Sequence, residues 1–328
     1  MTPRKYESLV KPLSIGRVKA QERASAWGPG NANQKVWLNG RDHLEGLKLN
    51  FSWGLHDQPG EWHTGLEPHV HPYPECHIFG GLDTANVKYL GAQIEVCLGE
   101  EQETYAFDEP TVVVVPAGLP HGPTITRRVF SPKGFGFYLV GLSSTPETTW
   151  LRKAIKPVKS TGKYAGLIKP LKSGLLTERR TLNVSRFTPE QLAQREEKTK
   201  KTGEKLGPGN ADHLVWMYGK DLEGLDVNLT WGFYSSPGVW HRGVGAHVHP
   251  VGEVLVFVGT DPGNIDYLGA EIEIDLGKEH ERYIFDRPSV VICPPGLPHN
   301  PVVTRWVDKS YSFFVINLAG EHGTRNVD

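Results

Sequence analysis

The stretch that decides the fold is GLEPHVHPYPECHIFGG, residues 65–81, which returns as GVGAHVHPVGEVLVFVG, residues 243–259. The shared HVHP begins at His69 and at His247, an offset of 178 positions (247 minus 69). The same offset relates PAGLPH, residues 116–121, to PPGLPH, residues 294–299. Because separate motifs recur at one constant offset, the chain is a tandem duplication.

The duplication extends over most of both halves of the 328-residue chain. Residues 44–129 align with the second half without a gap, and WGPGNANQKVWLNGRD aligns with LGPGNADHLVWMYGKD after a slip of one residue. Short lead-ins, LVKPL and LIKPL, precede the copies. We therefore expect five segments: an N-terminal lead-in (1–26), a first domain (27–150), a connector (151–206), a second domain (207–320) and a C-terminal tail (321–328).

Each copy has the composition of β structure. Segments such as LKLNFSW and VKYLGAQIEVCLG are rich in β-branched and aromatic residues, and turn residues separate such segments every ~8–12 positions. In GAQIEVCLG, the apolar residues Ile94, Val96 and Leu98 alternate with polar ones, which predicts a strand with one buried face. We predict an all-β fold of two tandem domains, each a sandwich or barrel, with one short helix in the connector between Thr188 and Gly203.

The composition excludes several classes of protein. The 36 basic residues nearly balance the 37 acidic ones, so we expect no nucleic-acid or anionic-membrane partner. No run approaches the ~18 apolar residues of a membrane span, and the N-terminal residues do not resemble a secretory signal. Three cysteines are few and odd in number, which is typical of a reducing compartment, so we expect a cytoplasmic protein. Two-fold association is the commonest arrangement, and we expect a homo-oligomer.

Histidines and a glutamate recur in each copy in a pattern typical of metal binding. His69 and His71 are two residues apart, so on a strand both side chains leave the same face. Glu75 follows across a proline-containing turn, and His121 follows the turn in PAGLPH. The second copy repeats the four ligand types in order: His247, His249, Glu253 and His299. Three imidazoles and one carboxylate suit Fe(II), Mn(II), Ni(II) or Zn(II), so we predict up to two divalent ions per chain.

These motifs resemble those of the cupin superfamily, and specifically those of a bicupin, which has two cupin barrels in one chain. The first cupin motif, a glycine followed by H-x-H, a spacer and Glu, is similar to residues 65–81 and 243–259. The second, P-x-G-x-x-H, is similar to residues 116–121 and 294–299. The resemblance covers both halves and omits the connector. It implies two double-stranded β-helix (jelly-roll) barrels, each with a metal ion inside one mouth.

The two copies differ beside these motifs. His77, two residues after Glu75, corresponds to Leu255, so we expect a more polar cavity in the first copy and take His77 as a candidate acid–base group. Such a histidine also serves as a hydrogen-bonded wall residue. Cys97 and Cys293 have no counterpart in the other copy, so we exclude both from the shared site.

Four further residues are shared between the copies. His63 and His241 each follow a tryptophan and are candidates for orienting a ligand or relaying a proton, or for a structural hydrogen bond at the rim. Arg127 and Arg305 lie beyond the second motif and are candidates for holding a substrate carboxylate, or for structural ion pairs.

Three classes of function are consistent with this pattern. The class that we expect is an Fe(II) dioxygenase, which binds O2 and a small hydroxylated or carboxylated organic substrate; aromatic substrates belong to this range. The alternative is a non-redox or Mn-dependent bicupin enzyme, similar to oxalate decarboxylases or sugar isomerases. The arginine that oxalate decarboxylases carry before the first motif histidine is replaced here by Leu66 and Val244. The third is a non-catalytic binding or storage cupin, a class that usually loses the metal ligands, whereas this chain keeps all eight.

Overall fold

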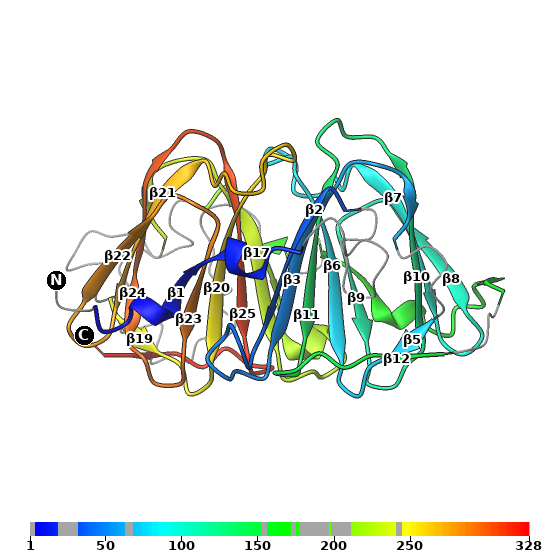
Figure 1. Ribbon diagram of the computed structural model, residues 1–328, viewed down its shortest axis with the longest axis horizontal. Coiled ribbons are helices and arrows are strands. Elements are labelled where there is room, and N and C mark those ends of the chain that lie inside the picture. The colour runs from blue at the N-terminus through cyan, green and yellow to red at the C-terminus, as the bar shows by residue number, and fades with distance from the viewer. Residues whose placement is uncertain are drawn as a thin grey trace.

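The computed structural model describes residues 4–18, 32–62, 68–151, 156–171, 175–176, 197, 211–240 and 245–327. Regular structure in these ranges is almost entirely β-strand, arranged in four sheets that form two barrels side by side (Figure 1). The helices whose two ends lie within these ranges are short 3-10 segments: η1 (Glu7–Leu9), η2 (Leu13–Gly16), η4 (Ala165–Leu167) and η7 (Gly219–Asp221). The all-β fold of two tandem barrels is confirmed.

The first barrel consists of two sheets. The sheet nearer the second barrel has the order β14-β9-β6-β11-β3-β2, and the outer sheet has the order β12-β5-β10-β7-β8-β13, with β4 also paired to β10. The strands of the inner sheet are β14 (Ile168–Pro170), β9 (Thr111–Val115), β6 (Glu75–Gly81), β11 (Phe135–Gly141), β3 (Asn50–His56) and β2 (Gln34–Asn39). Those of the outer sheet are β12 (Thr149–Trp150), β5 (His69–Val70), β10 (His121–Val129), β7 (Ala92–Leu98), β8 (Glu103–Phe107), β13 (Val158–Lys159) and β4 (Gly60–Glu61).

The second barrel repeats this arrangement. Its inner sheet has the order β1-β23-β20-β25-β17-β16-β15, and its outer sheet the order β22-β21-β24-β19-β26, with β18 paired to β24. The inner strands are β1 (Val10–Pro12), β23 (Ser289–Cys293), β20 (Glu253–Gly259), β25 (Tyr311–Asn317), β17 (Asn228–Tyr234), β16 (His213–Met217) and β15 (Leu175–Leu176). The outer strands are β22 (Glu281–Phe285), β21 (Ala270–Leu276), β24 (His299–Val307), β19 (His247–Val248), β26 (Arg325–Asn326) and β18 (Gly238–Val239).

The two inner sheets pack against each other and form a core between the barrels (Figure 1). On β6, Cys76 and Ile78 point into this core, whereas Phe79 belongs to the interior of the first barrel. Across the contact, Tyr138 stacks on Phe314 with ring centroids 5.1 Å apart. Because the inner sheets are buried on both faces, their central strands β9 and β11 are buried along their whole length.

Each lead-in pairs with the barrel of the other copy. Strand β1, from the N-terminal lead-in, pairs with β23 of the second barrel, and β14, from the connector, pairs with β9 of the first. The attachments are equivalent, since Tyr6 Oη donates to Glu279 at 2.8 Å and Tyr164 Oη donates to Glu101 at 2.8 Å. The exchanged strands cover two sheet edges that would otherwise offer unpaired backbone groups. They also tie the two barrels together.

Two predictions from the sequence concern single elements. The strand predicted from GAQIEVCLG is β7, in which Ile94, Val96 and Leu98 are buried as predicted. The helix predicted between residues 188 and 203 lies outside the described residues, apart from Glu197. The boundaries of the five segments stay a prediction. Within the described ranges, no helix is long and apolar enough to span a membrane.

Candidate metal centres

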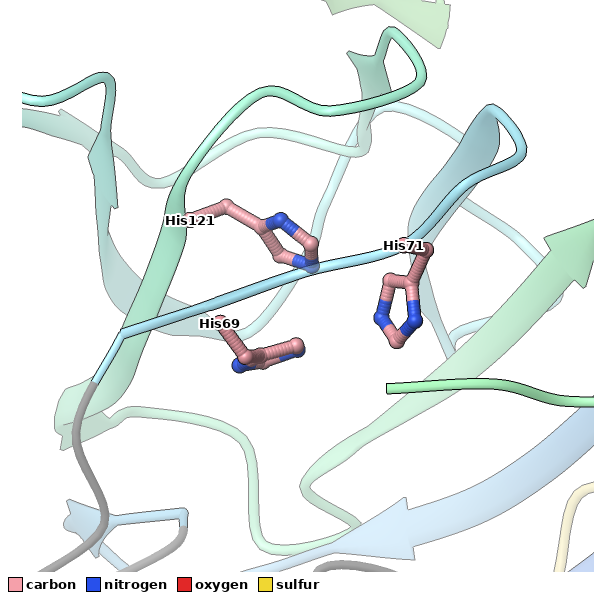
Figure 2. Close-up of side chains that lie close together, drawn as sticks. All are labelled: His69, His71 and His121. Carbon is pink, nitrogen blue, oxygen red and sulfur yellow. The ribbon is translucent and has the colours of Figure 1, made fainter. Parts of the chain in front are cut away.

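Three imidazoles of the first barrel point toward one another (Figure 2). His69 lies on β5, His71 follows this strand directly, and His121 opens β10, where it pairs in register with His69. One ring nitrogen of each lies within 4.8 Å of those of the other two. The pairing of β10 with β5 therefore joins the histidines of two separate motifs.

Glu75 brings a carboxylate to the same point. It opens β6 and is 1% exposed. Its Oε1 lies 3.5 Å from His71 Nε2, and its Oε2 lies 3.8 Å from His121 Nε2. Such separations are those of ligands that share one ion with bonds of ~2.0–2.2 Å, so the four predicted residues of the first copy have a geometry that could hold a metal.

Backbone carbonyls orient the imidazoles. The Nδ1 atoms of His71 and His121 lie 2.6 Å from Glu147 O and 3.0 Å from Leu119 O. Because a carbonyl only accepts, each Nδ1 carries the proton and each Nε2 keeps a lone pair toward the centre. The Nε2 of His121 is buried and has no hydrogen-bond partner within the described part of the chain, as expected of an atom that binds an ion. Gly118, at φ +76°, donates its N–H to His71 O at 2.8 Å and so holds the turn before His121 against the other ligands.

The protonation states also fit a metal. Burial opposes ionisation of Glu75, but the hydrogen bond from His77 and the neighbouring imidazoles outweigh burial and lower the pKa of this carboxyl below its usual range. Burial lowers the pKa of His121 to about 3. Near pH 7 the site therefore combines an ionised carboxylate with neutral imidazole, the forms that coordinate a divalent ion.

The second barrel repeats the arrangement. His247 on β19 pairs in register with His299 on β24, His249 follows β19, and Glu253 opens β20. Nitrogens of the three imidazoles lie within 4.8 Å of one another, and Glu253 Oε2 lies 3.4 Å from His249 Nε2 and 3.1 Å from His299 Nε2. The Nδ1 atoms of His249 and His299 donate to the carbonyls of Gly323 and Leu297. This donor set also fits a borderline divalent ion.

His77 distinguishes the first centre from the second. Its Nε2 lies 2.9 Å from Glu75 Oε2, and its ring centroid lies 5.5 Å from that of His121. In the second barrel, Leu255 takes this place, because His77 pairs with Val113 in the same register as Leu255 with Val291. The difference predicted between the two cavity walls therefore lies next to the candidate metal ligands.

The remaining predicted residues lie elsewhere. His63 and His241 are outside the described residues. Arg127 forms an ion pair with Glu95 at 2.6 Å, and Arg305 forms one with Glu271 at 2.9 Å. The arginine side chains are 49% and 42% exposed, so they occupy surface ion pairs, the structural role that the sequence allowed beside substrate binding.

Lys35 is a residue of the first barrel that the motifs did not indicate. It lies on β2, on the same side as Trp37, which packs against the barrel interior, and it is only 7% exposed. Its Nζ lies 4.8 Å from the Trp37 ring centroid, and within the described residues the ammonium has no carboxylate at ion-pair distance. Burial lowers the pKa of Lys35 to about 8, against the opposing effect of the Glu75 charge. Its counterpart in the second copy, after the one-residue slip in the alignment, is the apolar Leu214. This difference between the copies is the feature of the sequence that could have drawn attention to Lys35.

Two residues border the second centre and are also unmatched between the copies. Cys293 ends β23 directly opposite Glu253, where the first barrel has Val115 opposite Glu75. The counterpart of His322 is Pro146. The residues that follow these two, Gly323 and Glu147, each accept a hydrogen bond at their carbonyl from the second histidine of the motif. Cys293 and His322 each belong to a group of three residues whose ligand atoms lie within 4.8 Å of one another. Cys293 is grouped with Glu253 and His299, and His322 is grouped with His249 and Glu253.

Comparison with known proteins gives the fold. No protein-family model and no curated protein matches the sequence. Solved structures of oxalate decarboxylase from Bacillus subtilis do match. A tryptophan-to-phenylalanine variant has a TM-score of 0.57 and 11% identity, over 97% of this chain and 79% of that chain. An arginine-to-alanine variant has a TM-score of 0.55 and 12% identity over the same shares. A third structure, from a study of the enzyme's Mn(II) centres, has a TM-score of 0.56 and 11% identity over the same shares.

The chain therefore has the double-barrel cupin fold of the oxalate decarboxylases. The match extends over nearly the whole chain, so it includes both barrels and not a single cupin domain. At this identity the likeness concerns the fold, and the function has to be argued from the residues of the centres.

Proposed function

We propose that the protein is a manganese-dependent bicupin enzyme that releases CO2 from a small carboxylated substrate, with the reaction in the first barrel. The observation that carries this proposal is the convergence of three imidazoles and one ionised carboxylate in each barrel. His69, His71, Glu75 and His121 would hold the catalytic ion, and the matching residues of the second barrel would hold another. The bound ion would supply Lewis-acid and redox chemistry to a coordinated carboxylate.

The Fe(II) dioxygenase that the sequence favoured gains no support from the comparisons, because the matching structures are decarboxylases and one was studied for its Mn(II) centres. The same ligand set accepts either metal. We therefore take the alternative, a Mn-dependent metalloenzyme, as the proposed function. Use of O2 and assembly into a homo-oligomer stay predictions. The three cysteines are free thiols, which supports our proposal that the protein is cytoplasmic.

Lys35 supports a carboxylated substrate. Among the described residues the buried Lys35 ammonium has no carboxylate at ion-pair distance; such burial is costly, and an anionic ligand would offset that cost. The arginine that oxalate decarboxylases carry just before the first motif histidine is replaced here by Leu66. We propose that Lys35 binds the substrate carboxylate instead.

His77 supports the first barrel as the place of reaction. Its Nε2 contacts the Glu75 carboxylate, and its ring lies beside His121, so it is within reach of a molecule bound at the centre. An imidazole at this place can hold or move a proton, which contributes ~10²–10⁴ in rate when the group is well placed. The aliphatic Leu255 of the second barrel cannot move a proton.

The test is turnover with defined metals. Protein stripped of metal and reloaded with Mn²⁺ should release CO2 from small mono- and dicarboxylates, oxalate included, without net consumption of O2. Arg127→Ala, which removes a surface ion pair, is the matched control and should keep full activity. Activity that requires iron and consumes O2 would instead support the dioxygenase. A protein that binds no divalent ion would refute both enzymes.

A further inference from the structure

The second centre has a soft donor that the first centre does not have. Cys293 and Glu253 are directly opposed residues of neighbouring antiparallel strands, so their side chains leave the same face of the sheet, with Cβ atoms ~4.5–5.5 Å apart. Glu253 points to the centre of the second barrel, and Cys293 therefore does so too. In the first barrel this position is Val115, an apolar side chain that cannot bind an ion.

Distances between ligand atoms place the thiol within the centre. The Cys293 Sγ, a Glu253 carboxylate oxygen and a His299 ring nitrogen all lie within 4.8 Å of one another, and all three residues are buried. Donors that share one ion with bonds of ~2.0–2.3 Å are never further apart than about twice that length. The His299 Nε2 is itself buried without a hydrogen-bond partner in the described ranges, and it lies 3.1 Å from the Glu253 carboxylate.

A further imidazole approaches from the other side. His322 lies in the segment before β26, with its ring centroid 4.7 Å from that of His249 and a ring nitrogen within 4.8 Å of ligand atoms of His249 and Glu253. Cys293 and His322 therefore border the ligand atoms of the second centre from two sides, and each belongs to a group of three donors there.

We propose that Cys293 is a thiolate ligand of the ion in the second barrel, which makes that centre selective for Zn²⁺ or Co²⁺ over Mn²⁺. Thiolate ligands favour Zn²⁺, whereas manganese prefers carboxylate, carbonyl and water. The thiol proton leaves to solvent when the ion binds. This proposal rests on the proposed function only in that the second barrel holds an ion. It assigns manganese and turnover to the centre of the first barrel, and a thiolate-bound ion to the centre of the second.

Cobalt substitution of the full chain tests the proposal directly. A thiolate bound to Co²⁺ gives a charge-transfer band in the near ultraviolet that imidazole and carboxylate do not give. Wild-type protein loaded with two equivalents of Co²⁺ should show the band of one thiolate per chain. Cys293→Val, which installs the residue of the first barrel, should lose the band, whereas Cys97→Ser should keep it. The converse variant, Val115→Cys, should double it.

Metal competition gives a second readout. In a mixture of Zn²⁺ and Mn²⁺, Cys293→Val should lower the preference of the second centre for zinc by at least about tenfold. Two bound Co²⁺ per chain without a thiolate band, or a band that survives in Cys293→Val, would refute the thiolate ligand and leave the proposed function standing. Absence of bound cobalt from the wild-type chain would refute both.

Discussion

Replacing Lys35 by methionine should stabilise the protein. Methionine keeps the length of the aliphatic side chain and removes the buried charge. The pKa of Lys35 is lowered from 10.5 to about 8, mainly by burial, and each pKa unit corresponds to about 1.4 kcal/mol. The charged form in the wild-type fold therefore costs about 3 kcal/mol, and Lys35→Met should raise the free energy of unfolding at pH 7 by up to about that amount.

The gain should depend on pH in a defined direction. Below pH 8 the lysine is charged in both the folded and the unfolded chain, so the full cost is present. Between pH 8 and 10.5 the unfolded chain binds the proton more tightly than the folded one, so wild-type stability rises with pH. The advantage of Lys35→Met should therefore shrink over this window and nearly vanish above it.

Urea unfolding at pH 7 and at pH 10 measures both effects. Lys48→Met, which changes an exposed lysine, is the control and should shift stability by less than ~0.5 kcal/mol at either pH. The reciprocal variant Leu214→Lys should destabilise the second barrel. If Lys35→Met is less stable than the wild type at pH 7, or equally changed at both pH values, the ammonium has a partner in the folded chain and the argument for a substrate carboxylate fails.

Three further outcomes follow from the centres. Chelation should lower the melting temperature by roughly 5–10 °C without unfolding the chain at room temperature, because an ion at a hundredfold excess over its dissociation constant contributes ~2.7 kcal/mol to stability. Calorimetry measures the shift. No shift after verified metal removal would mean that the centres are empty or bind metal weakly. Glu75→Gln should abolish turnover while Glu253→Gln keeps most of it, each assayed after its metal content is measured, and equal losses would show that both barrels work. His77→Leu, which copies Leu255, should keep its metal and lower the rate by ~10²-fold or more with a changed pH profile; an unchanged rate would assign His77 a purely structural role.

The sequence alone determined the duplication and the all-β fold, and it indicated the eight residues that we propose as metal ligands. These features depend on local patterns. An H-x-H spacing puts both imidazoles on one strand face, and alternation of apolar residues in β7 predicts its buried side. The constant offset lets the two copies be compared position by position, so a histidine that occurs in both copies can be distinguished from one that occurs by chance in a single copy.

Only the tertiary structure decided which unmatched residues matter. Lys35, Cys293 and His322 each differ between the copies, as do many surface residues, and nothing local marks them. Strand pairing brings Cys293 opposite Glu253, barrel closure buries Lys35, and the segment before β26 carries His322 to His249. The exchange of lead-in strands was also decided by the tertiary structure. A strand such as β1 can pair with either barrel, and its own sequence does not indicate which sheet edge is free. Contacts between residues far apart in the chain depend on how sheets close and pack, and that information is absent from any single segment.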